Sequence, residues 1–525
     1  MLNSLLLAVA IVAHEPGYYT SLATHAQRWL RNEKIEARVV TPKEMDSALA
    51  KERLAMLVGF SAPTPAEMKS LQAFRARGGK LVVFYSGSKA LADLMGVQIV
   101  GYRTAAYPGE WSRMDFTTKI PDGLPPSIRQ TSTVLQRAAP KPGQGRVIAT
   151  WADRRGRSVG EPAWIASSAG YWMTHVLLAD GDEDLKAQLL GALVGSVEPS
   201  KWNAGVHRAR VQAKDAADRA VALRQVPRPG EIHAVWDHSG CGLYPGNWAR
   251  TMQLLKASHV TDLFVNVAGA GFAHYPSAVL PRSKTCEQEG DQLAACLAAA
   301  KGTGIRVHAW VLCFSATRAT PERLEAFRKQ GWRLATKQGK LTEYLDPSNS
   351  AVQNYMLSAI DEIQSRYDVS GIHLDFVRWG DGIAKPQNAS VPISRFVAAA
   401  RRHVKRPRWL TTAVYGKYPQ CVGSVGQDWY SWLSMNLVDY VVPMDYTESS
   451  AVFESFLQQH AAAPTHARKT IAGIGVTANE SRLDATQVIG QINLSRRYGL
   501  AGNALFDLDV TLEKQILPYL RMGIW

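Results

Sequence analysis

The chain has 525 residues, an apolar content of 46% and a formal net charge of +15. This length is sufficient for about two to four domains. No stretch approaches the roughly 20 apolar residues that a membrane-spanning helix needs. Lys and Arg residues are scattered along the chain and form no block typical of a nucleic-acid-binding surface. The charge therefore indicates solubility, or an acidic partner such as an anionic glycan or a cell surface.

The cysteines give little sign of a metal or redox site. No two of the five are spaced as Cys-x-x-Cys, so we expect neither a zinc site nor a redox motif, and we expect no cofactor. Cys286 and Cys296 are close enough in sequence to bridge a loop in an oxidising compartment. An odd number of cysteines leaves at least one free thiol.

The first residues allow two interpretations. Residues 5–13 are apolar and end in small side chains, as the core of a signal peptide does. No Lys or Arg precedes them, which departs from the usual signal peptide. The alternative is that they form the first strand of a folded domain.

Residues 1–200 show the alternation of buried strands and amphipathic helices that favours a doubly wound, parallel α/β sheet. The predicted strands are 7–13, 37–40, 54–60 and 81–86, and the predicted helices are 18–32 and 65–77. Residues 100–160 are richer in Pro, Gly and Arg and are expected to form hairpins and loops, followed by a helix at 182–197. A polar helix at 207–224 ends at Pro227-Arg-Pro-Gly230, so we place a helical linker at 201–229.

The segment Gly79 to Ser88 resembles the glutamine-amidotransferase-like, flavodoxin-like domains that are appended to some glycosidases. A glutaminase needs a nucleophilic cysteine at a strand-to-helix turn. The first 240 residues contain no cysteine. We therefore predict that this first domain is non-catalytic.

From Glu231 the rhythm of the sequence changes. Strand-like runs begin near eight positions: residues 232, 263, 305, 372, 410, 440, 471 and 504. Each interval can hold one helix, and the longest has room for an extra element at 321–345. Eight strand–helix units predict a (β/α)8 TIM barrel over residues 230–525.

The stretch from Asp368 to Asp381 is the most informative in the barrel. A helix is predicted at 351–367 and a short buried strand at 372–377. Asp375 falls near the carboxyl end of that strand, where the chemistry of such barrels takes place. Period-two geometry puts His373 on the same face, one layer deeper. The alternative is that Asp375 is a structural carboxylate bonded to a neighbouring loop.

Several ordered motifs make residues 230–510 resemble the glycosyl hydrolase-like 10 family, also called DUF187. The motifs are 268–283, 304–310, 345–350, 367–379, 427–432 and 438–447. Two positions differ from many members of the family. Asp375 is followed by Phe376 instead of a second Asp, and Asp445 stands where many members carry Asn.

The resemblance implies hydrolysis of O-glycosidic bonds, which requires two carboxyl groups. We expect Asp375, after the fourth strand, and Asp445, after the sixth, to meet at the mouth of the barrel. By analogy with α-galactosidase-type barrels, Asp375 is predicted as the nucleophile and Asp445 as the general acid/base. Asp445 could instead cap a loop, and Asp507, Asp509 and Asp237 are the competing acids.

Other side chains near the predicted strand ends are candidates for binding sugar. The aromatic candidates, whose rings can stack on sugar faces, are Trp236, Trp310, Trp379, Tyr415 and Tyr446. The polar candidates are Asn266, His308, Arg378, Asp237 and Asp507. His308 could contact a sugar hydroxyl, hold Asp375 or be a core histidine. Arg378 could bind an acidic sugar, or pair with Asp375 and lower the pKa of that carboxyl.

Three functions remain open on the sequence. The first is a glycoside hydrolase with a poly- or oligosaccharide substrate, expected in the periplasm or outside the cell. The second is a glycan-binding or scaffold protein that has kept a degenerate barrel. The third, polysaccharide deacetylation, is ranked lowest because it normally requires a metal-binding set of His and Asp residues, which the sequence does not display.

Overall fold

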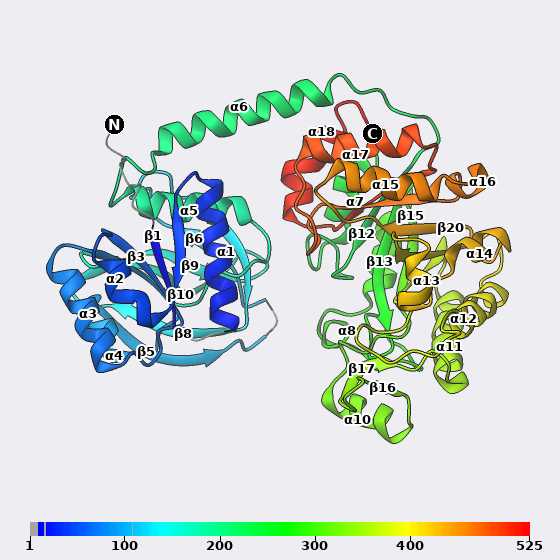
Figure 1. Ribbon diagram of the computed structural model, residues 1–525, viewed down its shortest axis with the longest axis horizontal. Helices are drawn as coiled ribbons and strands as arrows, with labels where there is room; N and C mark the ends of the chain where they lie inside the picture. The colour runs from blue at the N-terminus through cyan, green and yellow to red at the C-terminus, as the bar shows by residue number, and fades with distance from the viewer. Residues whose placement is uncertain (1–8, 15–16, 108) are drawn as a thin grey trace. The chain divides into compact units, whose positions relative to one another are not determined.

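The computed structural model describes residues 9–14, 17–107 and 109–525. The chain divides into two compact units, Met1–Asp215 and Ala216–Trp525. The division falls within helix α6 (Ala204–Ala222), inside the segment 201–229 that was expected to link two domains. The two units are described separately (Figure 1).

One half of the sheet in the first unit is parallel, as predicted. The nine strands follow the order β2-β1-β3-β4-β11-β10-β9-β6-β7. The parallel strands are β1 (Val9–Ala13), β2 (Ala37–Val40), β3 (Leu54–Val58), β4 (Lys80–Phe84) and β11 (Gly170–Met173). Residues 7 and 8 of the first predicted strand lie outside the described residues.

The other half of this sheet is antiparallel and is formed largely by residues 100–160, where hairpins were expected. Its strands are β10 (Ser158–Ser167), β9 (Gly145–Ala152), β6 (Trp111–Phe116) and β7 (Ser127–Ser132). Strand β11 pairs with β4 in parallel and with β10 in antiparallel, so it joins the two halves. Strands β5 (Val97–Thr104) and β8 (Val134–Pro140) form a separate hairpin.

Helices cover both faces of the parallel half, because successive strand residues point to opposite sides. Val9 and Ile11 of β1 face α1 (Tyr18–Asn32) and α5 (Glu183–Gly195). Ala10 and Val12 face the other cluster, which contains α2 (Met45–Leu49), α3 (Pro65–Ala76) and α4 (Lys89–Leu94). This arrangement is the doubly wound one that the sequence predicted, and Figure 1 shows the helices around the blue strands.

The second unit is a closed barrel of eight parallel strands, as predicted. The strands are β12 (Ile232–Asp237), β13 (Asp262–Gly269), β15 (Arg306–Leu312), β18 (Gly371–Asp375), β19 (Trp409–Tyr415), β20 (Tyr440–Met444), β21 (Ile471–Gly475) and β22 (Gly502–Phe506). Pairing of β12 with both β13 and β22 closes the ring. Each strand lies where a strand was expected from the sequence.

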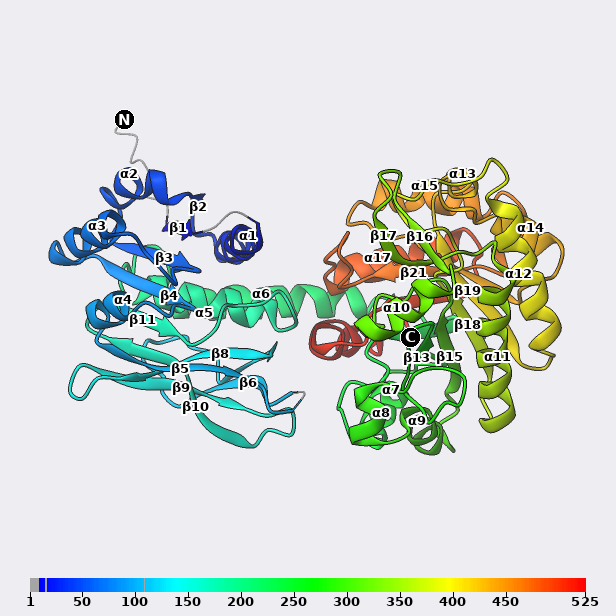
Figure 2. The same ribbon diagram turned by 90° about the horizontal axis from the view of Figure 1, so that it is seen from below.

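Helices surround the barrel strands, and Figure 2 shows several of them beside β18 and β19. The longer helices are α7 (Trp248–Ala257), α9 (Gln292–Ala300), α11 (Ser350–Arg366), α12 (Ser390–His403), α15 (Ser450–His460) and α17 (Ala485–Arg497). The shorter ones are α8 (Lys284–Glu289), α13 (Gln420–Val425), α14 (Trp429–Ser434), α16 (Pro464–Ala467) and α18 (Leu517–Leu520). The predicted insertion at 321–345 contains α10 (Pro321–Lys329) and the hairpin β16 (Arg333–Ala335) and β17 (Leu341–Leu345).

The barrel has an inner and an outer core, separated by the strands. In β12, Ala234 and Trp236 belong to a small cluster inside the ring, together with Phe264 and Trp310. Val235 belongs to the large cluster between the strands and the helices. This alternation decides which residues after each strand point toward the mouth and which point away from it.

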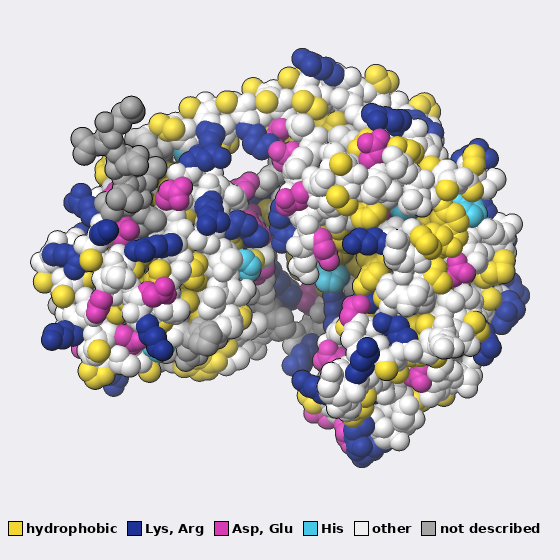
Figure 3. Space-filling view, in the orientation of Figure 1, with side chains coloured by type: hydrophobic (Ala, Val, Ile, Leu, Met, Phe, Trp, Pro, Cys, Tyr) yellow, Lys and Arg dark blue, Asp and Glu magenta, His cyan; other side chains and the backbone are white. Residues whose placement is uncertain are grey.

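Among the described residues, no helix is long and apolar enough to cross a membrane. Cys286 and Cys296 both carry free thiols, so the possible bridge between them is not formed. Lys and Arg side chains are spread over the visible surface of each unit, with acidic side chains between them (Figure 3).

Candidate active site

Asp375 lies at the carboxyl end of β18 and points into the barrel. Ile372 and Leu374 pack outward against the helices, so His373 and Asp375 have the inward positions. The strand is shorter than the predicted 372–377, because Phe376 adopts a φ of +52°. A positive φ is costly for an aromatic residue, and such backbone strain is frequent at functional sites.

Two donors hold the carboxylate of Asp375. The indole Nε1 of Trp310 donates to its Oδ2 at 3.1 Å, and the backbone N–H of Phe376 donates to its Oδ1. The residue is partly exposed. Burial of the carboxyl group raises the pKa of Asp375, although Phe376, Arg378 and Trp310 each oppose that rise. Arg378 therefore acts in the predicted direction, but its charge does not outweigh burial.

A fixed histidine forms the layer below Asp375. Nε1 of Trp236 donates to Nε2 of His373 at 2.9 Å, and Nδ1 of His373 lies 2.8 Å from the Thr411 hydroxyl oxygen. Because Nε2 accepts, the neutral ring carries its proton on Nδ1 and donates it to Thr411. Burial, and to a smaller extent the nearby His308, holds the pKa of His373 well below its usual range. This layer is a neutral support for the site.

Asp445 does not lie open at the mouth, which corrects the expectation for its position. Val442 and Tyr446 contact the inner cluster, so Asp445 points outward toward helix α15. Its side chain is 0% exposed, and its Oδ2 lies 3.5 Å from Nδ1 of His460. A side chain at Gly416 would place its Cβ 2.0 Å from Oδ1 of Asp445. Burial raises the pKa of Asp445 well above its usual range, which favours the neutral form of this carboxyl group in the wall of the barrel.

Two further polar candidates are also covered. Asp237 is 0% exposed and accepts hydrogen bonds from Ser239, Gly240 and Gly242, so it caps the turn after β12. Asn266 is 0% exposed and donates to the carbonyl oxygen of His238. Neither side chain is accessible to a sugar in this structure.

His308 belongs to the opposite end of the barrel from Asp375. Its Nε2 lies 2.8 Å from Oδ1 of Asp262, and both side chains are 0% exposed. Burial raises the pKa of Asp262, but hydrogen bonds from His308 and Arg306 outweigh this effect and hold it at about 2. Of the three roles considered for His308, the structure supports that of a core histidine.

The aromatic candidates separate into exposed and buried groups. Tyr415 and Tyr446 are partly exposed, whereas Trp236, Trp310 and Trp379 are at most 3% exposed. Nε1 of Trp379 donates to the carbonyl oxygen of Ala389, so Trp379 anchors a loop. Trp310 acts on the site through its hydrogen bond to Asp375. The ring of aromatic residues is therefore smaller at the surface than the sequence suggested.

The guanidinium of Arg378 lies between two rings at the rim. Its carbon is 3.8 Å from the centroid of Phe376 and 4.7 Å from that of Tyr415. Nη1 lies 3.4 Å from both the Trp379 carbonyl oxygen and Oδ2 of Asp381, and Nε is buried without a hydrogen-bond partner among the described residues. The side chain is a fixed cation beside Asp375.

Asp507, which follows β22, is the acid whose properties suit proton transfer best. It is partly exposed, and Thr477 Oγ1 donates to its Oδ1 at 3.0 Å. Burial, together with the charges of Asp509 and Asp237, raises the pKa of Asp507 to about 7. Asp509, also partly exposed, has a pKa raised by burial to about 6. The sequence identified both only as competing acids.

Tyr446 lies close enough to both Asp375 and Asp507 to feel the charge of each. Strands β18 and β22 are the fourth and eighth of the ring, so the two acids follow strands on opposite sides of the barrel. Burial raises the pKa of Tyr446, and the charges of Asp375 and Asp507 raise it further, which places the tyrosine within electrostatic range of both. Among the described residues, no three His, Cys, Asp or Glu side chains are grouped as a metal site.

Asp375 also lies inside the part of the chain that matches a known family. Residues 239–382 match the model of the family Glycosyl hydrolase-like 10. This match supports a carbohydrate-active function. It includes four of the six motifs noted in the sequence and leaves out those at 427–432 and 438–447.

Solved structures show similarity at low sequence identity. The glycoside hydrolase domain of PgaB (BpsB) from Bordetella bronchiseptica is 14% identical, with a TM-score of 0.45, over 57% of this chain and all of that one. An endo-1,4-beta-mannanase from Rhizomucor miehei is 10% identical, with a TM-score of 0.41, over 53% of this chain and 87% of that one. A putative ThuA-like protein from Bacteroides uniformis is 13% identical, with a TM-score of 0.30, over 38% of this chain and 96% of that one. No curated protein matches the chain.

Proposed function

We propose that the protein is a glycoside hydrolase that cleaves a poly- or oligosaccharide at the mouth of its barrel. The observation that supports this most strongly is the position of Asp375 and the hydrogen bonds that its carboxylate accepts. Its carboxylate points into the barrel, is partly exposed and is held by Trp310 and Phe376. Asp375 also lies in the segment that matches a family of glycosyl hydrolase-like proteins.

The second carboxyl group in this proposal is Asp507 rather than Asp445. Glycoside hydrolysis needs one acid to protonate the leaving oxygen, and that acid must reach the substrate. Asp445 is fully buried, whereas Asp507 is partly exposed and has a pKa raised to about 7. At neutral pH a substantial fraction of Asp507 carries the required proton.

The roles of the two acids follow from their surroundings. Burial raises the pKa of Asp375, but two hydrogen-bond donors and the charge of Arg378 oppose that rise, and we assign Asp375 the role of nucleophile or of base for the attacking water. Asp507, whose pKa is raised by burial and by two neighbouring carboxylates, serves as the general acid. The proton of Asp507 passes to the glycosidic oxygen as the bond to the leaving sugar breaks.

Substrate contacts are assigned to the partly exposed rim. Tyr446 and Tyr415 are partly exposed and offer rings for stacking on sugar faces. Arg378 is buried against the ring of Tyr415 and is the nearby cation for an acidic substituent. Trp236, Trp379 and His308 are assigned structural roles instead. We further propose that the protein acts in the periplasm or outside the cell, which fractionation of cells that express the native gene would test.

The test is hydrolysis of a panel of purified glycans by the wild type and by Asp375→Asn. Release of new reducing ends by the wild type, and loss of that release in the variant, would support the proposal. A second function, glycan binding without hydrolysis, is favoured by the burial of Asp445, which leaves the predicted pair of acids incomplete. Under this second function, the wild type and Asp375→Asn would bind the same glycan equally tightly, and neither would cleave any glycan of the panel.

A further inference from the structure

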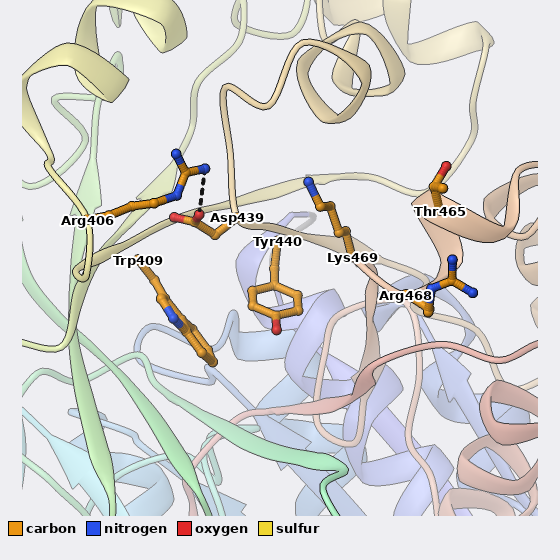
Figure 4. Close-up of a pocket in the computed structure, with 7 residues that line it drawn as sticks. All are labelled: Arg406, Trp409, Asp439, Tyr440, Thr465, Arg468 and Lys469. Atoms are coloured by element: carbon orange, nitrogen blue, oxygen red, sulfur yellow. Dashed lines mark ion pairs between the residues drawn. The ribbon is translucent and has the colours of Figure 1, made fainter.

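A pocket lies at the amino end of the barrel strands, away from Asp375. Its volume is about 550 Å³, within the range of pockets that hold small ligands. The lining residues precede or begin β19, β20 and β21: Arg406, Trp409, Asp439, Tyr440, Thr465, Arg468 and Lys469. Figure 4 shows their arrangement. In barrels of this type, that end normally serves stability.

The charges of this pocket are not balanced. Among the seven described lining residues, Asp439 carries the sole carboxylate. Its two oxygens are already bound, since Arg401 Nη1 lies 2.7 Å from Oδ2 and Arg406 Nη2 lies 3.2 Å from Oδ1. Lys469 donates to the neutral side chain of Asn436. The positive charge of Arg468 and Lys469 is therefore available to an anion.

Two aromatic rings form a platform beside these cations. The ring centroids of Trp409 and Tyr440 are 4.7 Å apart, and their planes are tilted by 48°. Trp409 stacks on His308 and lies 4.5 Å from the guanidinium carbon of Arg306, so its ring is fixed from behind. Both rings are partly exposed. In Figure 4 they lie next to each other, with Lys469 and Arg468 on the far side of Tyr440 from Trp409.

We propose that this pocket binds a carboxylate-bearing sugar, with the sugar ring on Trp409 and Tyr440 and the carboxylate at Arg468 and Lys469. The arrangement fits a sugar better than a nucleobase. Because the two rings contact each other at a tilt, they leave no flat slot for a base between them. An acidic saccharide can stack on the aromatic rings and pair its carboxylate with the cations at the same time. Binding here requires neither Asp375 nor hydrolysis, so it stands apart from the function proposed above.

The test is calorimetric titration of the full-length protein with trigalacturonate, its trimethyl ester and hexathymidylate. Trigalacturonate should bind, and the neutral ester should bind at least about tenfold more weakly. The double variant Arg468→Gln/Lys469→Gln should lose at least tenfold in affinity for trigalacturonate. The matched control Arg402→Gln/Lys405→Gln, which removes the same two charge types at exposed positions outside the lining, should change affinity less than twofold.

Two further variants separate this pocket from other sites. Tyr440→Ala should weaken binding, and Tyr440→Phe, which keeps the ring, should retain it. Asp375→Asn should bind trigalacturonate as the wild type does. The proposal is overturned if the double variant and its control bind alike, if the ester binds as tightly as the acid, or if binding depends on Asp375. It is also overturned if hexathymidylate binds more tightly than trigalacturonate, because the pocket would then be a nucleic-acid site.

Discussion

Trp310 Nε1 donates a 3.1 Å hydrogen bond to Oδ2 of Asp375, joining neighbouring strands of the barrel at the candidate catalytic carboxylate. This bond favours the ionised form of Asp375. Trp310→Phe should therefore raise the pKa of Asp375 further and move the acidic limb of the pH–activity profile to higher pH. We expect activity at neutral pH to fall about tenfold, as for loss of one hydrogen bond to a charged group.

Trp379→Phe is the matched control for this variant. It also removes one indole N–H, which in the wild type donates to the Ala389 carbonyl oxygen and does not touch Asp375. Its profile should keep the wild-type acidic limb. Equal displacement of the limb in both variants would mean that Trp310 acts through packing alone.

Asp507 and Asp445 are predicted to differ sharply when each is replaced by Asn. Asp507→Asn removes the proposed general acid, and activity should fall about 10²- to 10⁴-fold. Asp445→Asn replaces a fully buried carboxyl group, whose pKa is raised by burial, with a neutral amide of similar shape, so activity should stay within a few-fold of wild type. The values of kcat/KM for the two variants would decide which acid acts together with Asp375. A larger loss of activity in Asp445→Asn than in Asp507→Asn would make Asp445 the general acid.

The pH dependence of activity should reflect the raised pKa of Asp507, about 7. The general acid must be protonated, so activity should decline as the pH rises through about 7. The same shift has a consequence for stability. The folded state holds this proton more tightly than the unfolded chain, so the contribution of Asp507 to stability is lost between pH 3.8 and about 7. In Asp507→Asn, the residual activity should no longer decline as the pH rises through about 7. An unchanged decline would show that another group is responsible for the basic limb of the pH–activity profile.

Asp262 should contribute to stability rather than to chemistry. Its pKa in the folded protein is lowered from 3.8 to about 2, so its contribution is present above pH 3.8 and is lost as the pH falls to about 2. This shift corresponds to about 2 kcal/mol at neutral pH. Urea denaturation of Asp262→Asn should show a loss of at least this order at pH 7 and a smaller loss near pH 3.

The control for Asp262 is Asp361→Asn, which breaks an exposed Asp–His pair with His403. Exposed ion pairs contribute at most about 1 kcal/mol. A loss at Asp361 equal to that at Asp262 would show that burial of the Asp262–His308 pair does not matter. A large loss of activity without a loss of stability in Asp262→Asn would give His308 a functional role.

The sequence predicted the strands well because each barrel strand is a short run of buried β-forming residues bounded by turns. It did not predict that the sheet of the first unit continues through antiparallel strands. Residues 100–160 were recognised as hairpins, but the pairing of β11 with β4, which attaches them to the parallel half, is a long-range contact with no local signal.

Asp375 and Asp445 show why the candidate site was only partly predictable. Both follow strands, and the distance of a residue from a strand end was taken as a guide to its position. The direction of the side chain depends on register instead. Asp375 shares the inward parity of His373, whereas Asp445 falls between two residues that contact the inner cluster and therefore points outward. His308 also points into the barrel, but it lies near the amino end of β15 and so cannot reach a substrate at the mouth.

The central claim is that Asp375 cleaves glycosidic bonds at the mouth of the barrel. Its most direct test is reducing-end release from a panel of purified glycans by wild type, Asp375→Asn and Asp368→Asn, the last being a fully exposed Asp that precedes the same strand. The account predicts cleavage of at least one glycan by wild type and Asp368→Asn, and a loss of about 10²-fold or more in Asp375→Asn. Equal cleavage by all three proteins would contradict it.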